Sequence, residues 1–235
     1  AGLYGTDVSG VTFQGMSQVD QSGGTGIYLQ GNYTQVFGGT FEIYGSIQSY
    51  FYFESVMVTG ATFNGNTGLT IVDAENVDVT GNTYNMTGGT AITFHDTKNV
   101  TIHDEEITAG QTAFSITGSE TENFQVYDNT FANLNYGIIS SAPEVTIRNN
   151  EFSKISDYAI QHGGYYNLTV SDNTFEDCNY AVYIYSNTDS FTIRDNVMSN
   201  NRIRSASGSS YGIYLSGAQY GTITGNSVSQ FDQAR

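Results

Sequence analysis

Val170-Ser171-Asp172-Asn173-Thr174-Phe175 is the stretch that decides the fold of this 235-residue chain. An aliphatic residue is followed by an outward residue, a turn residue, Asn, a polar residue and a large apolar residue. We call this pattern the repeat phrase. It recurs, at steps of 21 to 30 residues, as Val8–Phe13, Val36–Phe41, Val58–Phe63, Val79–Tyr84, Ile102–Ile107, Val126–Phe131, Ile147–Phe152, Ile193–Met198 and Ile223–Val228. Such a nearly constant spacing predicts stacked structural repeats.

Short alternating segments lie on both sides of each phrase. Val100-Thr101-Ile102 illustrates the segment that leads into a phrase, and Ala181-Val182-Tyr183-Ile184 illustrates the segment that follows one. A period of two is typical of a β-strand that turns one face to a core. No window shows a sustained helical stripe, so the sequence predicts an all-β fold of short strands.

Stacked repeats place equivalent residues in columns, about 4.8 Å apart along the stacking axis. The turn Asn of each phrase predicts a ladder of hydrogen-bonded amides. Its members are Asn82, Asn129, Asn150, Asn173, Asn196 and Asn226. The apolar position predicts an aromatic stack of Phe13, Phe41, Phe63, Phe131, Phe152 and Phe175. Glu105 interrupts the Asn column, and we expect its carboxylate either to tip outward or to be satisfied locally.

The phrase, its turn Asn and its period of roughly 22 residues resemble the right-handed parallel β-helix repeat of the pectate-lyase-like superfamily. The resemblance covers nearly all of residues 8–232. It implies one single-stranded right-handed parallel β-helix, a solenoid of about ten coils, with residues 1–235 as a single domain. That superfamily contains lyases, hydrolases, epimerases, phage tailspikes and non-catalytic surface proteins, so the resemblance does not select a function.

Charge and termini narrow the expected partners and location. There are 23 acidic and 7 basic residues, a net charge of −16, which argues against binding to nucleic acid or to anionic membranes. No apolar run is long enough to span a bilayer, so membrane insertion is not expected. The chain begins at Ala1 and shows no capping helix. We therefore expect a fragment or processed part of a longer extracellular or surface-exposed protein, whose open ends could support homo-oligomers or end-to-end assembly.

A column of outward tyrosines is the candidate ligand-binding face. It consists of Tyr136, Tyr158, Tyr180, Tyr183, Tyr211 and Tyr214. Aromatic strips suit sugar rings, whose C–H faces pack on aromatic faces while their hydroxyls bond nearby polar groups. The alternative is a ladder that only stabilises the sheet through cross-strand contacts. Arg202 and Arg204, on the loop before the last coil, are further candidate ligand-binding residues.

A column of turn carboxylates is the candidate metal site. Its members are Asp104, Asp128, Asp172 and Asp195. Like charges spaced by one coil repel each other and can recruit calcium, which takes six to eight oxygen ligands. The alternative is a set of solvated turn residues chosen for local backbone hydrogen bonds. No other cofactor is required.

Catalysis is a third interpretation. Arg148 and Arg194 share an outward column with His103 and Tyr127, and Tyr183 lies on a following strand. Such groups could carry out β-elimination or epimerisation, or their proximity could be coincidence. The three histidines, His95, His103 and His162, lack the spacing of a zinc site, and we expect all of them at the surface.

The leading hypothesis is a non-catalytic extracellular β-helix module of a surface, fibre or spike protein. It would present a lateral face for glycan or cell-surface recognition. One alternative is a polysaccharide lyase or epimerase acting on acidic polysaccharide. Another is a structural subunit that stacks end to end into filaments.

Overall fold

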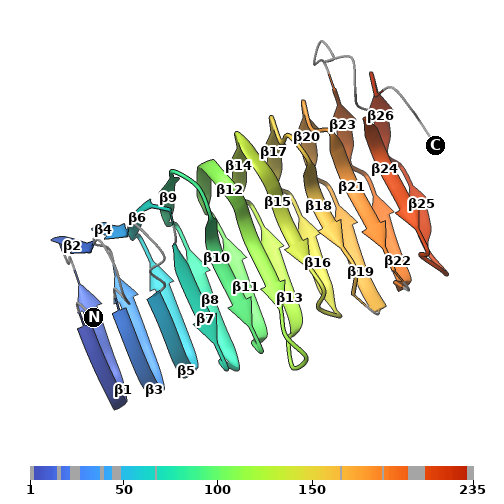
Figure 1. The fold of residues 1–235 in the computed structure, drawn as a ribbon. Helices are drawn as coiled ribbons and strands as arrows, with labels where there is room; N and C mark the ends of the chain where they lie inside the picture. The colour runs from blue at the N-terminus through green and yellow to red at the C-terminus, as the bar shows by residue number, and fades with distance from the viewer. Residues whose placement is uncertain are drawn as a thin grey trace.

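The computed structural model is a rod of parallel strands stacked from the N-terminus to the C-terminus (Figure 1). It describes residues 3–14, 17–21, 27–37, 40–43, 49–66, 68–164, 166–186, 188–200 and 210–231, and within these ranges it describes side chains from Ser55 onward. These residues form strands and turns, and none of their segments is a helix that could cross a membrane. All strand pairings are parallel, which confirms the predicted all-β solenoid.

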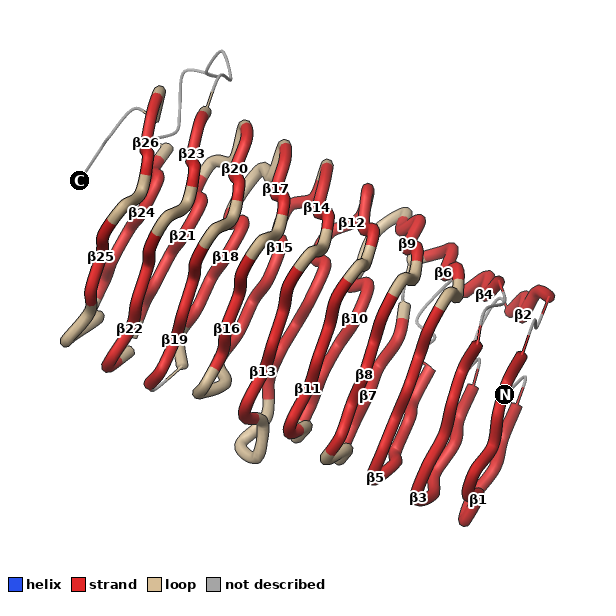
Figure 2. The backbone as a smooth tube through the Cα atoms, turned by 180° about the vertical axis from the view of Figure 1, so that it is seen from behind, coloured by secondary structure: helices blue, strands red, loops and turns tan. Residues whose placement is uncertain are grey.

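Three ladders run along the rod, and Figure 2 shows them from behind. The first ladder contains the strands that lead into the repeat phrase, each paired with the equivalent strand of the next coil. Its strands are β1 (Leu3–Gln14), β3 (Ile27–Phe37), β5 (Ser49–Thr59), β8 (Asn76–Thr80), β11 (Lys98–His103), β13 (Glu122–Tyr127), β16 (Val145–Arg148), β19 (Tyr166–Ser171), β22 (Asp189–Arg194) and β25 (Thr222–Thr224).

The second ladder contains short strands, which end the phrase in every coil after the first. Its strands are β2 (Ser17–Gln21), β4 (Thr40–Ile43), β6 (Thr62–Gly65), β9 (Thr83–Met86), the first part of β12 (Glu106–Thr117), β14 (Thr130–Ala132), β17 (Glu151–Ser153), β20 (Thr174–Glu176), β23 (Val197–Ser199) and β26 (Ser227–Ser229).

The third ladder contains the strands that follow the phrase and carries the tyrosine column. After the first part of β5, its strands are β7 (Leu69–Val72), β10 (Thr90–His95), the second part of β12, β15 (Leu134–Ser140), β18 (Tyr158–His162), β21 (Tyr180–Tyr185) and β24 (Tyr211–Ser216).

About six turns lie in the part of the chain whose side chains are described, against the ten coils expected for the whole repeat array. The first ladder advances six times between β5 and β22. Its backbone pairing continues to β1 and β3 on one side and to β25 on the other. The fold class is therefore as expected, while the number of turns is smaller than the repeat count suggested.

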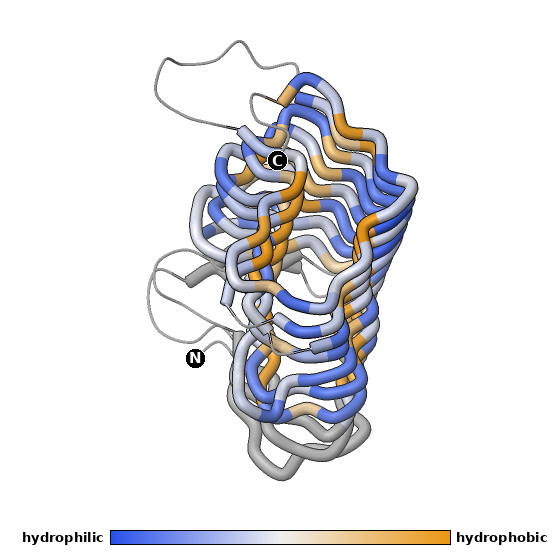
Figure 3. The backbone as a smooth tube through the Cα atoms, turned by 90° about the vertical axis from the view of Figure 1, so that its right-hand side faces the viewer, coloured by the Kyte–Doolittle hydropathy of each residue, from blue (hydrophilic) through white to orange (hydrophobic). Residues whose placement is uncertain are grey.

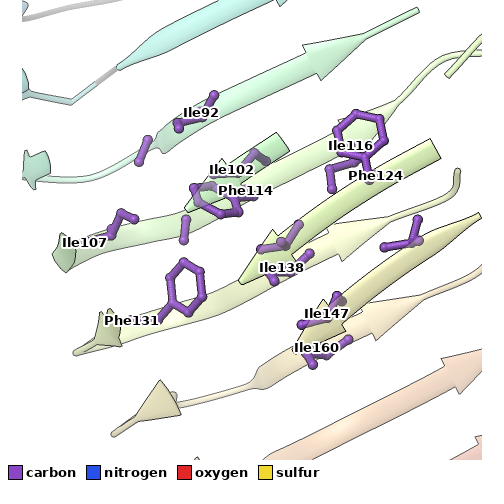
Figure 4. Packing of buried hydrophobic residues seen from close by; sticks show 14 of the residues in the cluster. Ile92, Ile102, Ile107, Phe114, Ile116, Phe124, Phe131, Ile138, Ile147 and Ile160 are labelled. Atoms are coloured by element: carbon purple, nitrogen blue, oxygen red, sulfur yellow. The ribbon is translucent and has the colours of Figure 1, made fainter. Parts of the chain in front are cut away.

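The core is a continuous apolar column inside the coils. β11 alternates between buried and accessible residues, with Val100 and Ile102 pointing inward. This alternation is typical of a strand that has one face on the core and the other in solvent. Seen along the rod, apolar residues recur at the same place in successive coils (Figure 3). Figure 4 shows Ile92, Phe114 and Ile138 from neighbouring coils pointing into this column.

The predicted aromatic stack is present over much of the second ladder. The rings of Phe131 and Phe152 are 4.7 Å apart, and those of Phe152 and Phe175 are 4.8 Å apart. Phe63 stacks on Tyr84 at 5.0 Å, so a tyrosine continues the column. Ile107 then interrupts the rings. The side chains of Phe13 and Phe41 lie outside the described part of the structure. The backbone register pairs Phe41 with Phe63, as predicted, but it pairs Phe13 with Val36 on the first ladder and Val19 with Phe41, so the prediction of Phe13 in this column is wrong.

The predicted asparagine ladder is confirmed. The Asn173 Oδ1 atom accepts hydrogen bonds from the Asn150 backbone N–H and the Asn150 Nδ2 atom, at 2.9 and 3.0 Å. The Asn173 amide in turn donates to Asn196 Oδ1 and to the Ile147 carbonyl oxygen, each at 3.0 Å. The same pattern joins Asn129 to the next coil. Each buried amide is thus fully used, which fixes the register of one coil on another.

Candidate functional site

The third ladder gathers the tyrosines into one lateral cluster, which we call the tyrosine patch: Tyr136, Tyr158, Tyr180, Tyr183, Tyr211 and Tyr214. Strand register places Tyr136 of β15 and the first residues of β18, β21 and β24 one above another at this face. Adjacent rings of the patch lie 4.9 to 6.1 Å apart between centroids. Tyr185, which the sequence analysis did not include, joins its edge 5.6 Å from Tyr183.

The rings of the patch do not form the flat strip that suits a sugar face. Tyr180 and Tyr211 stack with an angle of 22° between their planes, and Tyr158 and Tyr183 stack with an angle of 26°. Stacked rings cover each other's faces and leave edges and hydroxyl groups accessible. Tyr214 is the exception: its ring is nearly perpendicular to that of Tyr180, at 89°, and 36% of the residue is exposed. The patch therefore offers a row of hydroxyls with a crossed ring at one end.

Polar residues flank the patch where its strands begin. The residue before each tyrosine of the long column is Asn135, Asp157, Asn179 or Ser210. Asp157 is half-buried, and the interaction of its carboxylate with the Tyr136 hydroxyl raises the pKa of Tyr136. This polar column was missed at the sequence level, although an Asn or Asp directly before Tyr in three coils was a visible signal.

Three of the candidate catalytic residues come together on the first ladder. The His103 and Tyr127 rings stack at 5.0 Å with 2° between their planes. The Arg148 guanidinium carbon lies 4.1 Å from the centre of the Tyr127 ring, a cation–π geometry. We call these residues the His–Tyr–Arg stack. Two carboxylates hold its histidine: Asp104 Oδ2 lies 2.7 Å from His103 Nδ1, and Asp78 Oδ1 lies 3.6 Å from His103 Nε2.

The remaining candidate catalytic residues lie elsewhere. Ser171 separates Arg194 from Arg148 along the ladder. The Arg194 guanidinium is engaged by Asp195 at 2.8 Å and by Asp172 at 3.6 Å. Tyr183 belongs to the patch on the third ladder rather than to the stack. Arg202 and Arg204 lie outside the described residues.

The carboxylate column has a backbone explanation. Asp104, Asp128, Asp172 and Asp195 all adopt the left-handed conformation, with φ between 55° and 59°. Gly81 and Gly225 occupy the same phrase position with φ of 65° and 67°, so this turn requires a residue that tolerates positive φ. Within the described ranges, no three or more His, Cys, Asp or Glu side chains are grouped to hold a metal ion. Calcium binding stays a prediction that would use exposed turn carboxylates.

Glu105 does not tip outward, which corrects one of the two expectations for it. The residue is 2% exposed, and its Oε1 atom takes the ladder position by accepting from the Asn82 backbone N–H at 3.2 Å and from Asn82 Nδ2 at 3.0 Å. Its Oε2 atom has no partner of ordinary hydrogen-bond geometry, and neither has the buried Tyr84 hydroxyl beside it. Burial raises the pKa of Glu105 to about 8, against the hydrogen bonds from Asn82 that lower it.

His162 is buried, so the expectation of a surface histidine is wrong for this residue. It is 0% exposed, and both ring nitrogens lack a hydrogen-bond partner among the described groups. Burial lowers the pKa of His162 to about 4, because a charged imidazole is costly in an apolar interior. His95 and His103 are accessible, as expected. The alternation of β18 turns His162 inward, in line with Ile160.

The chain matches a family model described as a right handed beta helix region. The match covers residues 1–131 and, in a second overlapping alignment, residues 88–228. None of the curated proteins matches the sequence significantly.

Solved structures of the same architecture include enzymes and an adhesin. The A-module of the Azotobacter vinelandii mannuronan C-5 epimerase AlgE4 is 12% identical, with a TM-score of 0.62 over 100% of this chain and 87% of that chain. The Streptococcus pneumoniae surface protein and adhesin PfbA is 11% identical, with a TM-score of 0.61 over 95% and 90%. The Yersinia enterocolitica family 28 exopolygalacturonase is 10% identical, with a TM-score of 0.53 over 85% of this chain. This chain spans only 48% of the exopolygalacturonase, and at such identities the likeness is one of fold.

Proposed function

We propose, since this chain belongs to the family of right-handed β-helix proteins, that it is a non-catalytic module that binds glycans through the tyrosine patch. The module would act outside the cell or at a cell surface. The rod serves as a scaffold that holds the binding groups of successive coils in register, as solenoid proteins present extended lateral faces.

The observation that carries this proposal is the tyrosine patch itself. The column of Tyr136, Tyr158, Tyr180 and Tyr211 places phenol groups on four successive coils. With coils about 4.8 Å apart, such a row presents regularly spaced hydroxyls along the rod, which suits an extended sugar chain. A tyrosine hydroxyl can donate to and accept from sugar hydroxyls, and the crossed Tyr214 ring offers an aromatic surface to one sugar.

The comparisons support a polysaccharide-related or surface role without selecting one. The AlgE4 module is a mannuronan epimerase, the Yersinia protein is an exopolygalacturonase, and PfbA is a surface adhesin. The proposed surface location of this chain rests on the same comparisons, because PfbA is a surface protein. The end-to-end filament stays a separate prediction, although Leu215, Ile223 and Val228 on the last described strands are 39% to 48% exposed.

Replacing Tyr214 and Tyr183 together by Thr should weaken glycan binding about tenfold or more. Each ring contact is worth roughly 0.5–1.5 kcal/mol, and a tenfold change corresponds to about 1.4 kcal/mol. Threonine keeps the β-propensity of strands β21 and β24, so the fold should persist. Retardation in gels containing a panel of polysaccharides measures the effect.

Tyr166→Thr is the matched control, because Tyr166 is 44% exposed but begins β19 on the first ladder. Its retardation should equal that of the wild type. An equal loss in the control variant, or no loss in the double variant, would show that the patch is not the binding face.

A second candidate function is favoured by the His–Tyr–Arg stack. Arg148 could neutralise the carboxylate of a uronic acid, while His103 or Tyr127 moves the proton at the carbon next to it. These are the roles that β-elimination or epimerisation of an acidic polysaccharide requires. The carboxylates beside His103 would hold its imidazole in place.

This second function makes its own prediction. Incubation with alginate or polygalacturonate should yield unsaturated or epimerised products, and Arg148→Ala should lower the rate at least a hundredfold, as the loss of a charge-stabilising group does. Ultraviolet absorbance detects unsaturation, and proton NMR of the recovered polymer detects epimerisation. Lys98→Ala removes a remote cation, held by Glu120 and Glu122, and should leave the rate unchanged. Absence of any product from the wild type would contradict the hypothesis that the protein is a polysaccharide lyase or epimerase.

A further inference from the structure

We infer, building on the proposed glycan-binding function, that the tyrosine patch selects uncharged glycans over uronic-acid polymers because the Asp157 carboxylate lies within it. The class of ligand would then differ from the acidic substrate considered for the His–Tyr–Arg stack.

The backbone fixes the place of Asp157. Its N–H donates to the Asn135 carbonyl oxygen at 3.0 Å, and its own carbonyl oxygen accepts from the Tyr180 N–H at 3.0 Å. The residue directly precedes Tyr158, whose strand pairs with those of Tyr136 and Tyr180. Asp157 therefore lies at the edge where Tyr158 and Tyr180 begin their strands and where Tyr136 occupies the equivalent position of the preceding coil.

The side chain faces the tyrosines as well. The interaction of the Asp157 carboxylate with the Tyr136 hydroxyl is the main cause of the raised pKa of Tyr136. Burial is the larger cause for Tyr158, and the negative charge of Asp157 is the next. The carboxylate thus acts on at least two rings of the patch.

No described cation compensates this charge. The ion pairs among the described residues involve Lys98, Arg194, His95 and His103, and none of them includes Asp157. Arg148 and Arg194 belong to the first ladder rather than to the third, and Lys154, on the turn between β17 and β18, forms none of these ion pairs. A uronate carboxylate that approaches the patch therefore meets a like charge, in a protein whose net charge is −16.

A neutral sugar meets complementary groups instead. An ionised carboxylate only accepts hydrogen bonds, and the hydroxyls of a sugar can donate to it. Such charge-assisted bonds are the stronger kind and are typical of sites that orient a polar ligand. The neighbouring Asn135 and Asn179 amides add donors and acceptors at the same edge.

Three matched pairs of polymers test the inference: methyl-esterified and de-esterified homogalacturonan, dextran and carboxymethyl dextran, and hydroxyethyl and carboxymethyl cellulose. We expect the wild type to bind the uncharged member of at least one pair about tenfold more tightly than the charged member, as one nearby like charge at a protein surface implies. Asp157→Asn keeps the shape of the side chain and should reduce this preference to about threefold or less. Because the cause is electrostatic, 1 M salt should reduce it similarly in the wild type.

Asp189→Asn is the matched control, since it removes the same charge from the exposed start of β22, outside the patch. It should retain the wild-type preference. Equal or tighter binding of the charged members by the wild type, or an unchanged preference in Asp157→Asn, would overturn the inference and leave glycan binding standing. Binding to none of the six polymers would overturn the inference and the proposed function together.

Discussion

Replacing Asn173 by Leu should lower the free energy of unfolding by about 3–5 kcal/mol. The buried Asn173 side chain accepts two hydrogen bonds from Asn150 and donates to Ile147, Ser171 and Asn196. Leucine has a similar volume but cannot hydrogen-bond, so groups on both neighbouring coils would be left buried without partners. Each such group costs roughly 1–3 kcal/mol, and several are created at once.

Urea unfolding followed by circular dichroism measures this effect. Asn85→Leu is the matched control, because the exposed Asn85 makes one amide contact, to Asn64, at the surface. The control should change stability by less than about 0.5 kcal/mol. A loss below about 1 kcal/mol in Asn173→Leu would mean that the amide ladder aligns the coils without stabilising them.

Glu105→Gln should stabilise the protein at alkaline pH by about 3–5 kcal/mol and change little at pH 4. The folded-state pKa of Glu105, about 8, lies above its ordinary value of 4.5, so the folded state holds the proton more tightly than the unfolded chain. Its contribution to stability is complete below pH 4.5 and is lost as the pH rises through about 8. The shift corresponds to at most about 5 kcal/mol. Glutamine does not titrate and also provides the amide donor that the ladder lacks at this coil.

Unfolding midpoints of both proteins from pH 4 to pH 9 test this prediction. Loss of stability at acid pH has a different cause. The pKa of His162 lies below its ordinary value of 6.5, so the folded protein loses stability as the pH falls from about 6.5 to about 4. His162 is common to both proteins, and their difference therefore isolates Glu105. Parallel pH profiles for wild type and Glu105→Gln would contradict the assignment.

The repeat phrase predicted most of the fold because its positions have strict local requirements. The turn must hold a residue with positive φ, which explains why Asp172 and Gly81 alternate there, and in six of the ten copies the next position holds an Asn whose amide can bond to the neighbouring coils. Any sequence that repeats these requirements at a constant period builds the same coil. The Asn ladder and most of the Phe stack could be predicted from the sequence for this reason.

Less of the candidate site could be predicted from the sequence, because the site depends on side-chain orientation. The sequence placed the tyrosines on one face, but their stacking on one another follows from torsion angles that spacing does not determine. Glu105 could turn inward or outward, and the choice depends on the ladder acceptor position that Asn82 needs filled. His162 was misjudged because a polar residue on an alternating strand is normally turned outward, and this one follows the inward series instead.

Affinity electrophoresis of the wild-type protein against neutral and acidic polysaccharides tests the central claim most directly, with recovery of each glycan afterwards. We predict that at least one glycan retards the protein, that Tyr183→Thr/Tyr214→Thr weakens this binding about tenfold or more, and that the recovered glycan is unchanged in mass and NMR spectrum. Retardation with shortened, unsaturated or epimerised glycan would contradict a non-catalytic module. Retardation by none of them would contradict glycan recognition altogether.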